Sequence, residues 1–245
     1  MAELWVDKLS FARGDFKLRI DQLQIRPGEK VAILGENGSG KSTLLQLLCG
    51  LLPCGGEIRY DNRPLAQIPV VQRARLFSLL PQFSELIFPF SVAEVVLFGR
   101  FPHAIGNSFS DADRQLSEQQ LQQLDLLPLR ERQFNELSGG EKRRVMLARV
   151  LNQQAPIIYL DEPNASLDIR HTLEIFELLG GRRETVIAPV HDINLAEQFF
   201  DRFLLLKQGR LLADVSHAHL TPELLTETYD VQVTGGTAAF TFTRR

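Results

Sequence analysis

Short apolar runs alternate with amphipathic stretches along most of this chain. Residues 3–9 and 16–25 alternate apolar and polar side chains, the period-two pattern of strands with one buried face. Residues 31–34 are apolar at every position, as expected of a strand that is buried on both faces of a parallel sheet. A strand and turn are predicted at 57–62, and apolar strands return at 157–160, 185–190 and 203–207.

Helical periodicity occupies much of the sequence between these strands. Helices are predicted at 42–52, over most of 110–151, at 169–179 and at 193–200. Ser110 with Asp113 forms a capping pair at the start of a Gln- and Leu-rich helix. Pro128 interrupts the pattern, so a further helix is expected from about Ser138 to Leu151.

Strands and helices that alternate at this spacing predict an α/β fold with a mostly parallel sheet. The two alternating segments near the N-terminus predict an antiparallel β subdomain beside it. The helical stretch 83–151 interrupts the alternation and is interpreted as an inserted subdomain. We therefore predict one domain over residues 1–245, with a core formed by residues 1–82 and 152–245.

A glycine-rich loop joins the strand at 31–34 to the next helix and fits the phosphate-binding pattern G-x-x-x-x-G-K-[ST]. Glycine allows the tight turn, and the helix start offers unpaired N–H groups to an anion. Lys41 is expected to reach the β- and γ-phosphates, Ser42 to bind Mg²⁺, and Thr43 to approach the α-phosphate. The predicted nucleotide-binding residues of this loop are Gly35, Glu36, Asn37, Gly38, Ser39, Gly40, Lys41, Ser42 and Thr43.

Asp161 and Glu162 follow the apolar strand at 157–160. This position puts their carboxylates at the ligand-binding edge of a parallel sheet. We expect Asp161 to coordinate Mg²⁺ through water, and Glu162 to act as the general base on the attacking water. An ordinary solvated acidic pair is the alternative, which the upstream phosphate loop disfavours.

A second glycine motif, Leu137-Ser138-Gly139-Gly140-Glu141, has no use in an ordinary nucleotide pocket. Ser138 and Glu141 form a capping box, and a helix that starts with bare glycine presents N–H groups to an anion. Together with the phosphate loop and the Asp161–Glu162 pair, this motif resembles the ATPase subunits of ABC transporters, over about residues 3–231. The resemblance implies a P-loop NTPase core of the RecA-like type that hydrolyses ATP with Mg²⁺.

The resemblance also implies a head-to-tail dimer with two ATP molecules held between two copies. Ser138, Gly139 and Gly140 would close over the γ-phosphate bound by the other copy. Asp168, in a segment similar to the family's D-loop at 164–168, would cross the dimer interface.

Two further residues match functional positions of the family. Gln82 resembles the glutamine that contacts Mg²⁺ and the catalytic water. His191 resembles the histidine that senses the γ-phosphate, although a lone histidine is more often a surface or core residue.

The adenine site departs from the family pattern. The family usually has an aromatic residue near the end of the first strand, and Arg13 occupies that position here. Arginine can stack its planar guanidinium on a base. Phe11 and Phe16 are the alternatives.

Several features indicate a separate subunit that docks onto membrane proteins. The chain has one phosphate loop, no sustained heptads, and no window near the roughly 18 uncharged apolar residues that span a bilayer. Docking of two permease subunits is expected near residues 83–103. The segment 91–103, which ends Gly99-Arg100-Phe101-Pro102-His103, resembles ATPases that serve importers of ferric siderophores, haem and cobalamin. Residues 83–101 include Phe83, Phe88, Phe90, Phe98 and Phe101, which form either a docking surface or the core of the helical subdomain.

Composition limits which partners and which cellular compartment fit the chain. The net charge of −3 provides no basic field to attract nucleic acid, and no secretory signal is visible. Cys49 and Cys54 are the only cysteines, which argues against a disulfide framework and fits the cytosol. We expect a peripheral ATPase at the cytoplasmic face of the inner membrane that drives metal-chelate uptake, with a substrate-binding protein as an indirect partner. The alternatives are a soluble ABC-type ATPase acting on nucleic acid or ribosomes, and an unrelated phosphate-loop kinase or GTPase.

Overall fold

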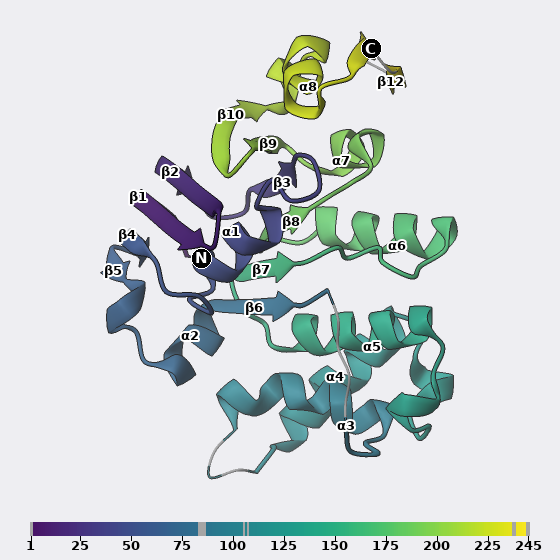
Figure 1. The fold of residues 1–245 in the computed structure, drawn as a ribbon. Coiled ribbons are helices and arrows are strands. Elements are labelled where there is room, and N and C mark those ends of the chain that lie inside the picture. The colour runs from purple at the N-terminus through teal and green to yellow at the C-terminus, as the bar shows by residue number, and fades with distance from the viewer. Residues whose placement is uncertain (1, 83–86, 105, 107, 237–238, 244–245) are drawn as a thin grey trace. The chain divides into compact units, whose positions relative to one another are not determined.

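The computed structural model describes residues 2–82, 87–104, 106, 108–236 and 239–243 (Figure 1). It has the predicted α/β fold, in two compact units. The first unit comprises Met1–Ile68 with Leu179–Arg245, and the second comprises Pro69–Leu178.

An antiparallel sheet begins the first unit. β1 (Leu4–Arg13) pairs with β2 (Phe16–Ile25), while β4 (Gly55–Tyr60) lies on the other side of β1 and is followed by β5 (Arg63–Pro64). Leu9 and Ile20 face each other across β1 and β2, and both are buried. The period-two pattern therefore places one apolar face on the core, as predicted.

Parallel strands make up the centre of the first unit. β3 (Lys30–Leu34) is buried at every position and lies between β8 (Thr185–Pro189) and β9 (Arg202–Lys207), parallel to both. β10 (Arg210–Ser216) is antiparallel to β9 and meets β2 at Arg19. The strand order in this unit is β5-β4-β1-β2-β10-β9-β3-β8.

Helix α1 (Lys41–Leu48) ends four residues earlier than the predicted helix at 42–52. Gly50 follows it in the left-handed conformation, with φ of 66°, which stops the helix. Tyr60 donates a hydrogen bond from its hydroxyl to the carbonyl of Leu48 at 2.8 Å, which fixes this end. The other helices of the unit are η1 (Leu65–Gln67), α7 (Ile193–Phe199), η5 (His217–His219) and α8 (Pro222–Tyr229).

A hairpin of β11 (Gln232–Gly236) and β12 (Ala239–Thr243) follows α8, in a region where the sequence pattern predicted no strand. The side chain of Asn194 accepts a hydrogen bond from the backbone N–H of Phe240 at 2.8 Å. Since Phe240 is also buried, this contact fastens the hairpin to α7.

Among its described residues, the second unit contains two parallel strands and several helices. β6 (Phe77–Leu80) and β7 (Ile157–Leu160) lie side by side, and the N–H of Asp161 donates to the carbonyl of Leu80 at 2.8 Å (Figure 1). The helices are α2 (Val70–Leu76), α3 (Val92–Leu97), η2 (Phe98–His103), α4 (Asp111–Gln123), η3 (Leu127–Leu129), η4 (Phe134–Glu136), α5 (Gly139–Asn152) and α6 (Ile169–Gly180).

Capping boxes start three of these helices. Those of α4, at Ser110, and α5, at Ser138, were predicted, and α3 adds a third at Ser91. α3, α4 and α5 pack on one another around buried Val95, Leu121 and other apolar residues. Within the described part of the chain, no helix has both the length and the apolar character needed to cross a bilayer.

Candidate functional site

The phosphate loop is shaped by positions that only glycine can occupy. Gly35 has φ of 145°, and a Cβ there would lie 2.2 Å from the carbonyl oxygen of Leu206. Gly40 has φ of 107°, and its Cβ would lie 2.9 Å from the ring of Phe16. These approaches are too close for any side chain, so the loop packs its bare backbone against β2 and β9.

The loop surrounds a buried cation. Lys41 is 6% exposed, and its ammonium donates to the carbonyls of Gly35 at 2.7 Å and Glu36 at 3.0 Å. The buried hydroxyl of Ser39 has no hydrogen-bond partner among the described residues. Since α1 also starts here without an acidic residue in its first turn, these groups fit the chemistry of a polyphosphate.

Tyr229 supports the loop from the end of α8. The N–H of Gly35 donates to the Tyr229 hydroxyl at 3.0 Å. Burial raises the pKa of Tyr229 to about 12, so the hydroxyl stays neutral over the physiological range. No motif pointed to this residue, because it lies far along the sequence from the loop.

The candidates for adenine stacking lie together near the turn between β1 and β2. Arg13 pairs directly with Phe16, and Phe11 pairs with Leu18 on the same face of the two strands. Arg13 is exposed, whereas Phe16 is half-buried and has its ring beside Gly40. Phe16 is therefore the candidate that lies next to the phosphate loop.

His191 and the phosphate loop lie at the same edge of the parallel strands in the first unit. His191 follows β8, which pairs with β3, and the N–H of Val190 donates to the carbonyl of Ile33 at 3.2 Å. His191 is exposed, and Asp192 caps α7 immediately after it. Two predicted site segments, the loop and His191, thus follow adjacent parallel strands.

A second group of predicted residues comes together in the second unit. Gln82 follows β6, while Asp161 and Glu162 follow β7, and Leu80 pairs with Leu160 at the ends of these parallel strands. Asp161 is 5% exposed, and Glu162 is half-buried with φ of 52°. The amide and both carboxylates therefore share one strand edge.

The second glycine motif starts α5, a helix of 14 residues. The Glu141 carboxylate accepts from the Ser138 hydroxyl at 2.7 Å and from the Ser138 N–H at 2.8 Å, which lowers the pKa of Glu141. Ser138 and Gly139 are exposed, whereas Gly140 is half-buried against the 164–168 segment, where an added Cβ would lie 3.1 Å from the Ser166 carbonyl oxygen. The motif is thus a capped helix start with an open glycine face.

Asp168 ends the 164–168 segment and caps α6. Its carboxylate accepts from the backbone N–H of His171 at 2.8 Å and contacts the His171 ring nitrogen Nδ1 at 2.9 Å. These contacts lower the pKa of Asp168. The structure thus gives Asp168 a local partner in its own chain.

Comparison with known proteins decides the family. Residues 18–165 match the ABC transporter family. The hemin import ATP-binding protein of Pseudomonas entomophila (strain L48) is 42% identical over 239 residues, which cover 93% of this chain and 92% of that protein. This chain belongs to the ATP-binding subunits of ABC transporters. As a member of that family it is an ATPase that couples ATP hydrolysis to transport.

Solved structures agree with this assignment. An inward-facing ABC transporter of the metal-chelate type has a TM-score of 0.81 and 27% identity, and the match covers 99% of this chain and 96% of that chain. A bacterial ABC transporter cassette solved as a dimer has a TM-score of 0.76 and 27% identity, with coverage of 87% and 98%. The P-loop NTPase fold predicted from the sequence is therefore confirmed.

Arg143 is a site residue of this ABC ATPase that sequence reasoning missed. It lies on α5, is 6% exposed, and donates to the carbonyls of Pro81 and Glu162, both at 2.6 Å, and of Asp161. Burial lowers the pKa of its guanidinium to about 10, although nearby Asp161 and Glu162 oppose that shift. Arg143 thus joins α5 to both strand ends.

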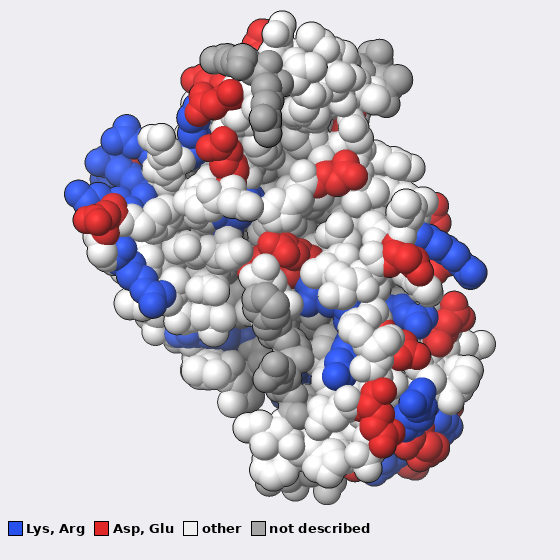
Figure 2. Space-filling view, turned by 45° about the vertical axis from the view of Figure 1, so that its right-hand side comes forward, with Lys and Arg blue, Asp and Glu red and all other residues white. Residues whose placement is uncertain are grey.

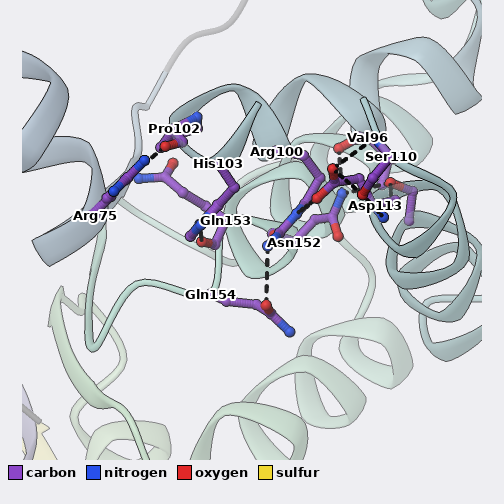
Figure 3. A network of polar contacts seen from close by, with 11 residues as sticks. Arg75, Val96, Arg100, Pro102, His103, Ser110, Asp113, Asn152, Gln153 and Gln154 are labelled. Atoms are coloured by element: carbon purple, nitrogen blue, oxygen red, sulfur yellow. Dashed lines mark hydrogen bonds and ion pairs between the residues drawn. The ribbon is translucent and has the colours of Figure 1, made fainter. Parts of the chain in front are cut away.

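Residues 99–103, the end of the 91–103 segment that resembles importer ATPases, take part in a buried polar network (Figure 3). Arg100 pairs with Asp113 at 2.8 Å and donates to the carbonyl of Asn152 at 2.8 Å. His103 contacts the carbonyl of Gln153 at 2.9 Å. Hydrogen bonds from Ser110 and Arg100 lower the pKa of Asp113 to about 2. The segment thus ties α4 to the end of α5.

Aromatic rings near this segment form a row, which we call the aromatic row. Successive centroids are 4.9 to 6.1 Å apart, along Phe88, Phe90, Phe98, Phe101 and Phe109. One interpretation of the sequence was that all five phenylalanines of residues 83–101 fill the core of the helical subdomain. Phe88 is 64% exposed and Phe101 is 55% exposed, so that interpretation is wrong for these two. Phe83, the first of that predicted group, lies outside the described residues.

Proposed function

We propose that this chain is the ATP-hydrolysing subunit of an importer for haem or a related metal chelate. The observation that carries the proposal is the 42% identity, over 93% of this chain, to a hemin import ATP-binding protein. The likeness to a transporter of the metal-chelate type supports the same class of cargo.

ATP is the proposed nucleotide, held through its phosphates by the loop at 35–43. The buried charge of Lys41 supports this role, as does the buried Ser39 hydroxyl, which has no hydrogen-bond partner within the described part of the chain. We assign Mg²⁺ coordination to Ser42 and Gln82, and to Asp161 through water, since Mg²⁺ prefers oxygen ligands and these residues supply hydroxyl, amide and carboxylate oxygens. Bound Mg²⁺ would neutralise charge on the phosphates.

Glu162 is the proposed general base that accepts a proton from the attacking water. Gln82 orients that water, and His191 responds to the γ-phosphate. Arg13 or Phe16 stacks on adenine, with Phe16 favoured by its contact with the loop.

We propose that two copies dimerise on ATP, and that Ser138, Gly139 and Gly140 of one copy close over the γ-phosphate held by the other. The exposure of Ser138 and Gly139 at the start of a long helix supports this role. Asp168 of each copy would lie at the interface. The two units would act together as one ABC ATPase domain over 1–245, with 83–151 as its helical subdomain.

The exposed part of the aromatic row, at residues 88–101, is the proposed docking surface for two permease subunits. A substrate-binding protein would act with them indirectly. Docking would hold the chain at the cytoplasmic face of the inner membrane. Acidic and basic side chains are interspersed on the face shown in Figure 2, and the net charge is −3, which supports a protein partner over nucleic acid.

The test is uptake by the complete transporter. The tagged chain is isolated from membranes with its co-purifying subunits, the complex is reconstituted in vesicles, and ATP-dependent uptake of hemin is measured. We expect uptake with the native chain and none with Glu162→Gln as the matched control. Recovery with ribosomes or nucleic acid instead of membrane subunits, or a complex that moves no metal chelate, would contradict the proposal.

A further inference from the structure

Arg143 connects three segments that the sequence had assigned separate roles. It lies one turn into α5, the helix that begins at the glycine motif. Its guanidinium donates to the carbonyl before Gln82 and to two consecutive carbonyls around Glu162, those of Asp161 and Glu162 itself. One buried cation therefore lies at the ends of both parallel strands.

The two consecutive bonds restrict the backbone of Glu162. A carbonyl that accepts a bond fixes the orientation of its peptide plane, and the planes of Asp161 and Glu162 flank the Glu162 Cα atom. Since the orientations of both peptide planes are fixed, the direction of the Cα–Cβ bond of Glu162 is fixed as well. Glu162 has φ of 52°, a left-handed conformation that non-glycine residues rarely adopt.

We propose that Arg143 is a positioning residue for ATP hydrolysis, which aims Glu162, and also Gln82, by holding the peptide groups beside them. This inference rests on the assignment of Glu162 as general base under the proposed function. Small displacements of a catalytic group reduce a rate steeply, so the loss of this restraint should lower kcat more than it lowers ATP affinity.

The chemistry of arginine suits this position. Its planar guanidinium carries five N–H donors in a fixed fork and so can reach several carbonyls at once. Lysine keeps the charge but donates from a single atom, and glutamine has a short uncharged amide. The next residue, Arg144, is half-buried and donates to the carbonyl of Leu124 at 3.3 Å. Among the described residues, it makes no hydrogen bond to the strand ends at Gln82 and Glu162. Arg144 therefore offers a matched control on the same helix.

The experiment compares the full-length native chain with Arg143→Gln, Arg143→Lys and Arg144→Gln. Hydrolysis of Mg²⁺-ATP gives kcat and KM, and equilibrium binding of labelled ATP gives Kd. We expect kcat to fall roughly 10- to 100-fold in Arg143→Gln, partial recovery in Arg143→Lys and no change in Arg144→Gln, with Kd within about threefold throughout.

Amide hydrogen exchange provides a readout that general destabilisation does not reproduce. In Arg143→Gln, exchange should accelerate at the amides of 161–162 and at those of 80 and 82, while α3 keeps its native rate. Acceleration spread evenly over the chain, or a loss of kcat that disappears after correction for the folded fraction, would overturn the inference.

Two further outcomes separate this inference from the proposed function. If Glu162→Gln loses hydrolysis while Arg143→Gln keeps native kcat, or if Arg144→Gln loses as much as Arg143→Gln, only the role of Arg143 is wrong. If Glu162→Gln hydrolyses ATP at the native rate, the assignment of the base fails and the inference fails with it. Should Arg143→Gln not fold, Arg143→Lys decides, since a native kcat in that variant contradicts the inference.

Discussion

The two regions that carry the predicted site residues are built by different means. In the first unit, the phosphate loop is shaped by exclusion, because a Cβ at Gly35 or Gly40 would collide with neighbouring atoms. In the second unit, one long side chain, Arg143, holds the strand ends by donating hydrogen bonds to their carbonyls. The loop depends on the absence of side chains, and the strand ends depend on the presence of one.

This difference has a consequence for function. The loop supplies fixed backbone groups and a buried charge, which suit the binding of an anion. The strand ends supply two carboxylates and an amide whose directions matter, which suits chemistry on a water molecule. Binding and hydrolysis should therefore be separable by substitutions in the two regions.

The largest expected effect is on hydrolysis, and it separates hydrolysis from ATP binding. Glu162→Gln removes the proposed base but keeps the shape of the side chain, so kcat should fall by about 10³-fold. The Kd for ATP should stay within about threefold, since the proposed phosphate contacts are untouched. Steady-state hydrolysis and equilibrium binding on the same preparation check this. If Glu162→Gln lost ATP affinity as strongly as it lost kcat, binding and hydrolysis would not be assigned to separate regions.

The complementary change lies in the loop. Lys41→Ala removes a charged hydrogen-bond donor, a loss of about 1.5–3 kcal/mol, so ATP affinity should fall roughly 10- to 100-fold. Lys30→Ala is the matched control, because Lys30 is also buried in this unit and donates to the carbonyls of Arg182 and Glu184 at 2.9 and 2.7 Å. Its Kd should remain native, and an equal loss in both variants would contradict a specific role for Lys41.

A smaller effect tests how the loop is supported. Tyr229→Phe leaves the N–H of Gly35 without its acceptor, so the free energy of unfolding should fall by about 1–3 kcal/mol and ATP should bind a few-fold more weakly. Chemical denaturation and nucleotide binding measure the two changes. Native values for both would show that the loop holds its shape through its glycines alone.

The same hydroxyl predicts a pH dependence. The folded-state pKa of Tyr229 is raised to about 12 from an ordinary 10.0, so its contribution to stability is complete below pH 10 and is lost as the pH rises toward 12. The native chain should therefore lose roughly 2 kcal/mol more than Tyr229→Phe across that interval. Denaturation of both proteins at matched pH values gives the difference, and identical pH profiles would contradict it.

The sequence predicted those parts of the structure that depend on neighbouring residues. The phosphate loop, the capping boxes at Ser110 and Ser138, and the buried strand β3 are all contiguous patterns, and each lies where it was expected. The C-terminal hairpin was missed because both strands are only five residues long and β11 ends in two glycines, which weaken the strand signal.

Contacts between distant residues could not be predicted in this way. Tyr229 and Gly35 are 194 positions apart, and Arg143 and Pro81 are 62 positions apart. A buried arginine that binds carbonyls has no acidic partner at a fixed spacing, so nothing in the local pattern distinguishes Arg143 from Arg144. Only the pairing of β6 with β7 brings its acceptors together.

Completion of each site by a second copy is the central claim, and mixing two variants tests it most directly. Lys41→Ala weakens the phosphate loop, and Ser138→Arg blocks the glycine motif, while Ser110→Arg, which removes the matching cap of α4, controls for helix disruption. At an ATP concentration near the native Kd, each of the first two should be nearly inactive alone, and Ser110→Arg should stay active. Because a mixed dimer contains one site with an intact loop and an intact motif, the mixture should regain a measurable part of native hydrolysis. A mixture as inactive as its two components would contradict the claim.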